Sequence, residues 1–193
     1  MNRRSGFTVV ELLMVIVVIA ILAAVTIVTY SGVQQRARNA QTAGAVNQYL
    51  KIFKLYASNN NGTYPTSANL SGAQYACLGE DYTSNVCWNG GVTENTWLNG
   101  ELKKYGSLPM PASISQGYTG IIYIPPETGW TLDGQPMSWI AYPVDGGATT
   151  TRCPVGPIAS YVSGINFTPA SPASGQTTAG SATQNPICWI PLK

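Results

Sequence analysis

The sequence predicts an α+β protein, with one long helix at the N-terminus and an antiparallel β-sheet domain after it. Three observations predict this class. Residues 7–28 are almost entirely apolar and contain neither proline nor glycine. No proline occurs between residues 7 and 57, so a single helix can continue well beyond the apolar run. From residue 67 onward the chain is rich in Gly, Pro, Thr, Tyr and Trp and shows no long helical periodicity, which favours strands joined by turns.

The first part of the helix has the length and composition of a membrane span. A helix over residues 7–57 would be about 75 Å long, and residues 7–28 alone would cover about 33 Å. That length matches the hydrocarbon layer of a bilayer, which is about 30 Å thick. The many Val and Ile residues disfavour a helix in water, but in lipid the backbone must satisfy its own hydrogen bonds. Arg3 and Arg4 hold the N-terminus on the cytoplasmic side, so the remainder is expected outside.

The second part of the helix is expected to pack on the β domain. Polar residues become frequent after Tyr30. Apolar residues recur every three or four positions and give the helix one apolar face: Ala43, Val46, Leu50, Phe53 and Ala57. Asn and Gly at residues 59–62 tolerate the left-handed backbone that ends a helix. Tyr64 and Pro65 then exclude helical continuation.

The strand candidates lie in the C-terminal two-thirds. Each is a short run with β-branched or aromatic residues: residues 119–124, 137–142, 149–153 and 187–190. Residues 127–134 carry turn signals between the first two strands. A short helix is expected over residues 96–105, with Leu98 and Leu102 facing inward. The sheet is expected to pack on the outer half of the long helix, and the low-complexity residues 169–181 to form an exposed loop.

Four cysteines predict two disulfides: Cys77, Cys87, Cys153 and Cys188. An even number in a chain exported across a membrane is typical of a disulfide-closed domain. Four cysteines allow three connectivities, of which we favour Cys77–Cys87 and Cys153–Cys188. A zinc site is disfavoured because the cysteines lack Cys-x-x-Cys spacing.

Composition argues against catalysis and against nucleic acid as a direct ligand. The chain has no His, which removes the commonest general base and metal ligand. The acidic residues do not form a recognisable catalytic pair, so no catalytic residue, metal or cofactor is predicted. Glu80 and Asp81 could bind a cation, but a solvated loop is the preferred interpretation. Without Arg3 and Arg4 the chain has eight basic and eight acidic side chains, so it has no basic field suited to nucleic acid.

Glu11 is the only charged residue in the apolar run. A carboxylate there costs about 2.5–3.5 kcal/mol on membrane-insertion scales, which is acceptable if it later meets a cation. The segment from Arg3 to Leu13, with Gly6 and Phe7 ahead of Glu11, resembles the processing site of type IV prepilins. Such a resemblance requires a small residue, an aromatic residue, a Glu at a fixed distance and an unbroken apolar helix.

The resemblance implies processing and assembly. A prepilin peptidase would cut after Gly6 and methylate the new amine of Phe7, and Glu11 would pair with the N-terminal amine of a neighbouring subunit. It implies a pilin fold with four parts: a leader at residues 1–6, a membrane-spanning and filament-core helix at 7–29, an outer helix at 30–58 and a globular domain at 59–193. The second predicted disulfide resembles the loop near the C-terminus that a disulfide closes in many pilins.

The resemblance also implies a function and its partners. Before assembly, the chain is expected to reside in the cytoplasmic membrane as a single-pass precursor. An assembly platform with an ATPase would then extract it into an extracellular homo-oligomeric filament that supports adhesion, twitching motility or DNA uptake.

Several alternatives remain. Within the family, the rival is a pseudopilin of a type II secretion system. Outside it, the rivals are an ordinary signal peptide or anchor and a membrane-anchored binding or enzymatic domain. The tryptophans could stack on sugars, although a role in the core is preferred: Trp88, Trp97, Trp130, Trp139 and Trp189.

Overall fold

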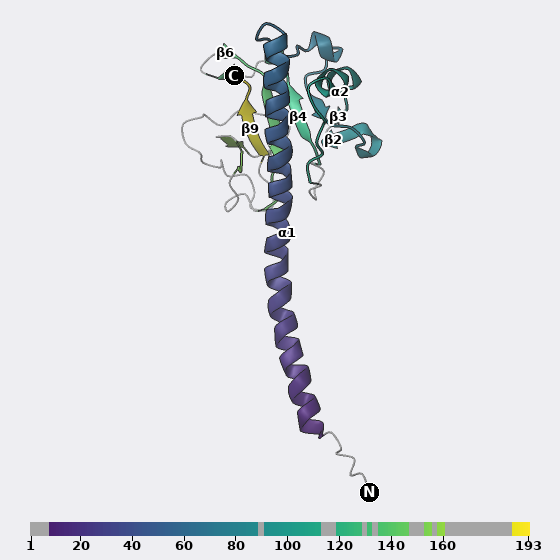
Figure 1. Cartoon of the computed structure of the whole chain (residues 1–193), viewed down its shortest axis with the longest axis vertical. Helices are drawn as coiled ribbons and strands as arrows, with labels where there is room; N and C mark the ends of the chain where they lie inside the picture. The colour runs from purple at the N-terminus through teal and green to yellow at the C-terminus, as the bar shows by residue number, and fades with distance from the viewer. Residues whose placement is uncertain are drawn as a thin grey trace. The chain divides into compact units, whose positions relative to one another are not determined.

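The computed structural model describes residues 8–88, 91–112, 119–128, 131–132, 135–146, 153–155, 158–160 and 187–193. The chain divides into two compact units, Met1–Ala37 and Arg38–Lys193. The long helix α1 (Val9–Asn59) contributes residues to both units (Figure 1). The predicted α+β class, a long N-terminal helix followed by an antiparallel sheet, is confirmed.

In the first unit, α1 presents apolar side chains to its surroundings. Every described side chain from Val9 to Val25 is exposed, including Glu11. Among the described residues, α1 is the one helix long and apolar enough to cross a membrane. An exposed apolar surface of this extent is stable in lipid or against other helices, and not in water.

The helix ends at the predicted place through a left-handed turn. Asn61 has φ 53° and Gly62 has φ 77°. The Gly62 backbone N–H donates to the Ala57 carbonyl oxygen at 2.8 Å, which is the bond that closes a Schellman motif. Asn and Gly enter this backbone region more readily than other residues, so the local sequence fixes the end of α1.

The second unit contains a five-stranded antiparallel sheet with strand order β1-β4-β7-β9-β8. The strands are β1 (Ala76–Leu78), β4 (Ile121–Ile124), β7 (Trp139–Pro143), β8 (Ile158–Ser160) and β9 (Ile187–Pro191). The predicted strands at 119–124, 137–142 and 187–190 correspond to β4, β7 and β9. β7 continues one residue further than expected, because Pro143 still pairs with Ile187. Of the predicted strand at 149–153, only Cys153 is described and it is not in a strand; the loop at 169–181 lies outside the described residues.

Smaller elements surround the sheet. The helix α2 (Thr96–Lys103) confirms the predicted short helix, with Leu98 and Leu102 buried and Asn95 as N-cap. Two hairpin-like pairs and three 3-10 turns complete the described elements: β2 (Val86–Trp88) with β3 (Val92–Thr93), β5 (Thr131–Leu132) with β6 (Gln135–Pro136), η1 (Ala68–Leu70), η2 (Thr83–Asn85) and η3 (Pro126–Thr128).

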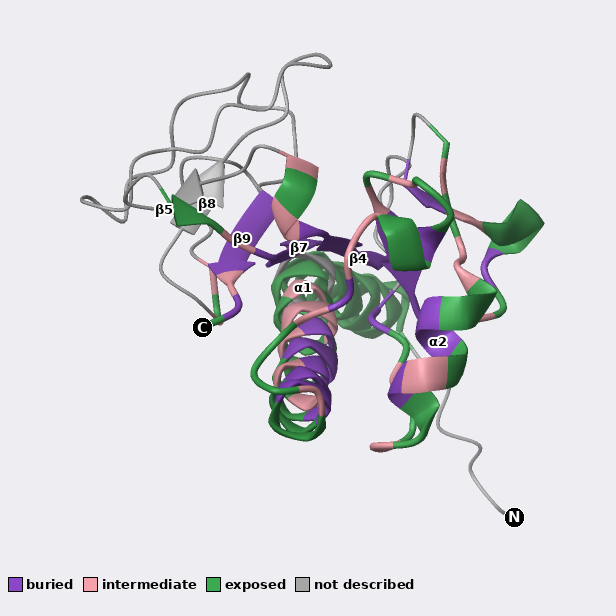
Figure 2. Ribbon diagram, turned by 90° about the horizontal axis from the view of Figure 1, so that it is seen from above, coloured by how far each residue is buried: buried purple, intermediate pink, exposed green. Residues whose placement is uncertain are grey.

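The sheet is buried on both faces. One face packs against α1, and there the Phe53 ring stacks on the Tyr123 ring with centroids 4.9 Å apart. The buried side of α1 faces the sheet, beside β4 and β7 (Figure 2). The opposite face carries a second cluster that includes Trp139 and Trp189. Because side chains alternate along a strand, burial of both faces explains why these strands are continuous apolar runs in the sequence.

Two disulfides close the second unit. Cys77 in β1 is joined to Cys87 in β2, and Cys153 is joined to Cys188 in β9. These are the pairings that the sequence analysis favoured. The first bond attaches β1 to β2, which follows it in the chain, and the second attaches β9 to the segment around Cys153, which precedes it. Each bond therefore holds a segment outside its strand against the sheet.

Tyr49 provides a stability test of the packing on α1. Its side chain is fully buried, and its hydroxyl has no hydrogen-bond partner among the described residues. Burial raises the pKa of this hydroxyl, so it stays a protonated polar group in an apolar site. Tyr49→Phe is expected to raise the free energy of unfolding by about 1 kcal/mol, because it removes the unsatisfied group.

Tyr123 is the matched control, because its hydroxyl donates to the Pro65 carbonyl oxygen at 2.6 Å. Tyr123→Phe is expected to lower the free energy of unfolding by about 1 kcal/mol. Denaturant unfolding of the full chain in detergent, followed by tryptophan fluorescence, measures both changes. A loss of stability in Tyr49→Phe as large as that in Tyr123→Phe would contradict this account of Tyr49.

Candidate functional site

The N-terminal end of α1 is a capping box built from Thr8 and Glu11. The Glu11 carboxylate oxygen Oε2 accepts from the Thr8 backbone N–H at 2.9 Å and from the Thr8 hydroxyl at 2.7 Å. In return, the Glu11 backbone N–H donates to the Thr8 hydroxyl oxygen at 3.2 Å. This reciprocal arrangement satisfies donors that the first turn of a helix otherwise leaves free. Thr8 was not predicted as a site residue, although the spacing Thr-x-x-Glu was visible in the sequence.

Among the described residues, the capping box leaves the negative charge of Glu11 without a cation. Its hydrogen-bond donors are an amide and a hydroxyl, which are neutral groups. The first basic residue after Glu11 is Arg36, which is 25 positions further, or about 38 Å along the helix. A cation for Glu11 must therefore come from the N-terminus or from another chain. Gly6 and Phe7 lie outside the described residues, so their roles in cleavage and methylation stay predictions.

The second unit holds its part of α1 through an ion pair. Arg38 Nε donates to Asp145 Oδ2 at 2.6 Å, and a second guanidinium nitrogen also pairs with that carboxylate. Asn39 donates its side-chain amide to the Asp145 carbonyl oxygen at 2.8 Å and accepts from the Asp145 backbone N–H at 2.7 Å. These contacts fix the loop after β7 to α1. Arg38, one of the basic residues of the helix, is therefore already paired within its own chain.

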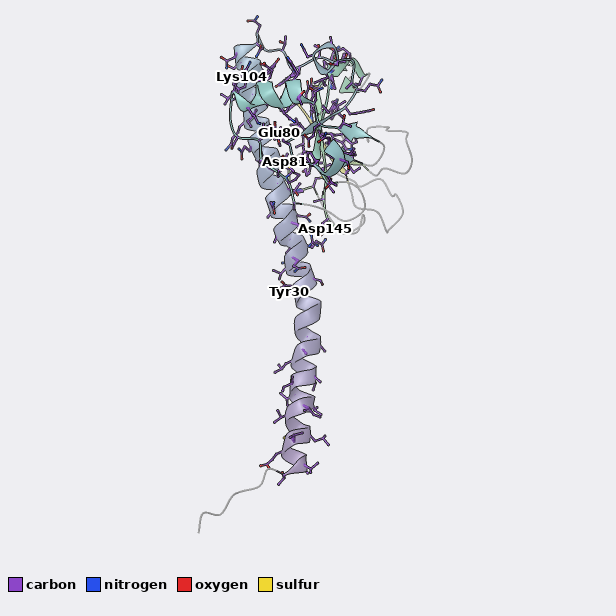
Figure 3. The ribbon with its side chains drawn as sticks, turned by 90° about the vertical axis from the view of Figure 1, so that its right-hand side faces the viewer. Tyr30, Glu80, Asp81, Lys104 and Asp145 are labelled. Carbon is purple, nitrogen blue, oxygen red and sulfur yellow. A yellow bond between two sulfur atoms is a disulfide. The ribbon has the colours of Figure 1, made fainter. Side chains whose placement is uncertain are left out.

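Most of the described acidic side chains of the second unit have local structural partners. The following carboxylates bind a neighbouring ammonium or backbone N–H: Glu80 to Lys103, Glu94 to Tyr82, Glu101 to Lys104 and Glu127 to Ser67. Within the part of the chain that is described, no three His, Cys, Asp or Glu residues gather as metal ligands. The positions of Glu80, Asp81, Lys104 and Asp145 can be compared in Figure 3.

Three of the five tryptophans belong to the core. Trp88, Trp139 and Trp189 are buried, whereas Trp97 is 39% exposed. Trp130 lies outside the described residues. A sugar-stacking platform needs several exposed rings on one surface, and the three buried rings are not available for that role.

The N-terminal segment matches a known family model. Residues 1–27 match the family described as the prokaryotic N-terminal methylation motif. This motif and the relative described below support a type IV pilin family. The long N-terminal helix and the antiparallel sheet are then the two parts of a pilin fold. Type IV pilins are structural proteins, and the capping box at Glu11 lies inside the matched motif.

A curated relative supports this assignment. The chain is 39% identical over 61 residues to the type IV wide pilus major component PilA4 of Thermus thermophilus. The aligned part is 32% of this chain and 47% of the relative, so the chain spans about half the length of the relative that it matches. No solved structure matches the chain.

Proposed function

We propose that this pilin is a structural subunit of a type IV pilus, processed at Gly6 and assembled through α1. The observation that carries the proposal is the Glu11 carboxylate at the start of an exposed apolar helix, which is capped by Thr8 and pairs with no cation of the described part of the chain. In a membrane or filament core, such a charge is stabilised by an opposite charge at the same depth. The amine created at Phe7 by cleavage is a cation of this kind, and every neighbouring subunit would present one.

The proposal includes the partners of this pathway. A prepilin peptidase cleaves and methylates the precursor in the cytoplasmic membrane, and an assembly platform with an ATPase extracts the subunit. Helices form the filament core and the disulfide-closed units form its surface. Adhesion, twitching motility or DNA uptake follow from the filament. The relative, a wide pilus major component, supports a pilus in preference to a secretion pseudopilus.

Shearing filaments from intact cells tests this function. We expect the sheared fraction to contain the chain, and mass spectrometry to show a mature N-terminus at Phe7 that carries one methyl group. Immunogold electron microscopy should place the chain along external filaments. A chain that stays cell-associated while secretion requires it would indicate a pseudopilin, and a mature start near Ala24 or Val25 would contradict the pilin proposal.

Gly6→Glu should block processing. A small residue fits the scissile position, and a charged side chain there is expected to stop cleavage. The full-length precursor would then accumulate in the membrane. The amount of processed subunit would fall by about tenfold or more, which corresponds to a loss of about 1.4 kcal/mol in binding of the cleavage site by the peptidase. Immunoblotting and N-terminal sequencing measure the two forms.

Asn2→Glu is the matched control, because it adds the same charge to the leader away from the scissile bond. We expect normal processing in that variant. Normal cleavage of Gly6→Glu would remove the assignment of the cleavage site to Gly6.

A further inference from the structure

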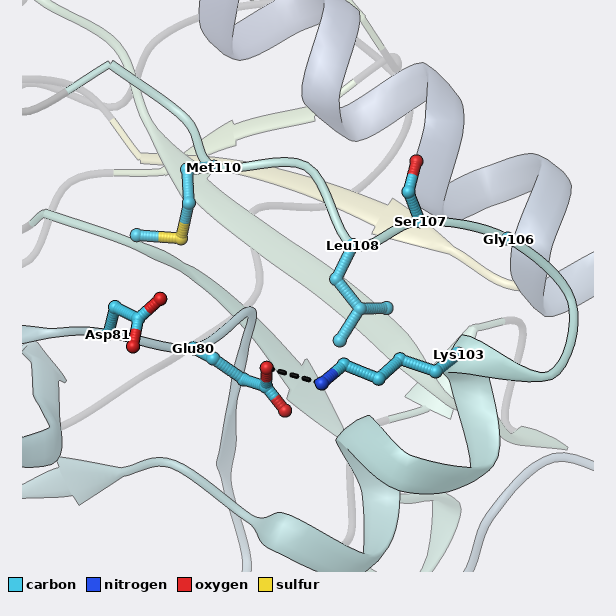
Figure 4. Close-up of a pocket in the computed structure, with 7 residues that line it drawn as sticks. All are labelled: Glu80, Asp81, Lys103, Gly106, Ser107, Leu108 and Met110. Carbon is cyan, nitrogen blue, oxygen red and sulfur yellow. Dashed lines mark hydrogen bonds and ion pairs between the residues drawn. The ribbon is translucent and has the colours of Figure 1, made fainter.

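A cavity of about 420 Å³ opens beside the loop that the Cys77–Cys87 disulfide closes. It lies between two segments of the second unit (Figure 4). Its lining consists of charged residues on one side and mainly apolar residues on the other: Glu80, Asp81, Lys103, Gly106, Ser107, Leu108 and Met110. The cavity thus combines carboxylates with an apolar wall.

The two carboxylates of this cavity differ in their partners. Glu80 pairs with the Lys103 ammonium at 2.5 Å. Asp81 is exposed and has no hydrogen bond or ion pair with any described residue. Opposite it, the Met110 side chain is 41% exposed. A free carboxylate beside an apolar wall suits the side chain of Lys or Arg, whose stem is apolar and whose head is charged.

The backbone holds Asp81 in place. Asp81 has φ 66° and Gly79 has φ 108°, both in the left-handed region. The positive φ of Gly79 favours glycine, and a Cβ atom there would lie 2.9 Å from the Met110 sulfur, so a larger residue would also require the Met110 side chain to move. The Asn99 side chain donates to the Gly79 carbonyl oxygen at 2.5 Å, which fixes the loop further. The carboxylate is therefore presented on a defined backbone.

The outer part of α1 supplies cations that lack partners. After Glu11, the α1 sequence contains basic residues and no acidic residue. Arg38 is used by Asp145, but Arg36, Lys51 and Lys54 are exposed and make no ion pair with any described residue. A second copy of the chain thus carries a cation for Asp81, whereas Lys103 in the cavity already pairs with Glu80.

We propose that the cavity receives a basic side chain from α1 of a neighbouring copy, with its head at Asp81 and its stem on Leu108 and Met110. The donor is Arg36, Lys51 or Lys54. Such a contact uses two different surfaces of the same chain, so it is heterologous and is compatible with an open helical filament. The inference rests on the proposed pilus function, and it adds a contact between subunits outside the apolar part of α1.

Asp81→Asn tests the contact with little disturbance of the loop. Asn tolerates the left-handed backbone as Asp does, so the substitution removes the charge and keeps the shape. In sheared filaments at low salt, we expect the sedimenting fraction of Asp81→Asn to be several-fold lower than that of the wild type. The difference should vanish near 1 M salt, where the Debye length is about 3 Å.

Glu101→Gln is the control, because it removes one carboxylate that already pairs with Lys104 of its own chain. Its filaments should sediment as the wild type does. If Asp81→Asn and Glu101→Gln sediment alike at every salt concentration, the inference is wrong. Failure of the wild-type chain to form any filament would instead contradict the proposed function.

Neutral substitutions of the donors identify the partner. Arg36→Gln, Lys51→Gln and Lys54→Gln are each combined with Asp81→Asn in a double-mutant cycle. The true donor should reproduce the salt phenotype of Asp81→Asn, and the double variant should be no worse than either single variant. Additive effects with all three donors would show that Asp81 contacts something other than α1 of a neighbour.

Discussion

Glu11→Gln is expected to leave membrane insertion and leader cleavage intact and to reduce the amount of filament about tenfold or more. A loss of about 1.4 kcal/mol per contact between subunits corresponds to a tenfold change in the association constant. Removing the charge makes insertion easier, by up to about 2.5–3.5 kcal/mol for a carboxylate at the middle of a bilayer. Loss of assembly therefore could not be attributed to membrane entry. What the variant lacks is attraction to the cationic amine of Phe7, an interaction that low-dielectric surroundings strengthen.

The capping box makes Gln the informative substitution at this position. A Gln side chain can accept the same hydrogen bonds from Thr8 as Glu11 does, so Glu11→Gln removes the charge and keeps the cap. Glu11→Ala removes both, and its additional effect is the loss of a cap contact, typically about 1 kcal/mol. If the charge is what matters, both variants lose filaments. If the cap is what matters, only the Ala variant does.

Met14→Gln is the matched control for a polar amide within the apolar helix. Met14 is exposed on α1 and close to Gln in size, and Glu11 stays intact in this variant. Filaments and processed subunit should be measured in the same cells for all variants. Normal filaments from Glu11→Gln would show that packing of apolar helices is sufficient for assembly, and the role proposed for the Glu11 charge would be wrong.

The elements with strong local patterns could be predicted from the sequence. The long helix follows from the absence of proline and from the apolar run, and its end follows from Asn61 and Gly62. The strands β4, β7 and β9 are apolar on both faces, which makes them visible as continuous runs. The strands β1 and β8 were missed because each has three residues, too few for a periodicity to be recognised.

The contacts at the sites depended on information that is not local. Arg38 and Asp145 are 107 positions apart, so no spacing rule connects them. The sequence analysis interpreted Asp81 as part of a solvated loop. Its position opposite Met110 results from the disulfide and the sheet, which bring segments together that are far apart in the sequence. Thr8 was missed for a different reason: a capping box can be recognised only when the first residue of the helix is known. The resemblance directed attention to Phe7 as the first residue of the mature chain.

Removing the Cys153–Cys188 disulfide is expected to lower the free energy of unfolding of the second unit by about 4 kcal/mol, against about 3 kcal/mol for Cys77–Cys87. The two bonds close loops with sequence separations of 35 and 10 residues, and the longer loop loses more conformational entropy in the unfolded chain. Cys188 is also fully buried in β9, which pairs with both β7 and β8. Loss of its bond should therefore weaken the attachment of two strands.

The double variants Cys153→Ala with Cys188→Ala, and Cys77→Ala with Cys87→Ala, allow the comparison without leaving unpaired thiols. Alanine is preferred to serine because a buried hydroxyl would add its own desolvation penalty at Cys188. Denaturant unfolding of each full chain in detergent gives the two free energies. Domains of this size have a free energy of unfolding of about 5–15 kcal/mol. A chain that lacks both disulfides would lose about 7 kcal/mol of it, which is enough to bring a domain at the lower end of this range to unfolding. Equal unfolding midpoints for the wild type and the Cys153/Cys188 variant would contradict this prediction. They would show that packing of β9 alone holds the sheet, and that closing the long loop removes little conformational entropy from the unfolded chain.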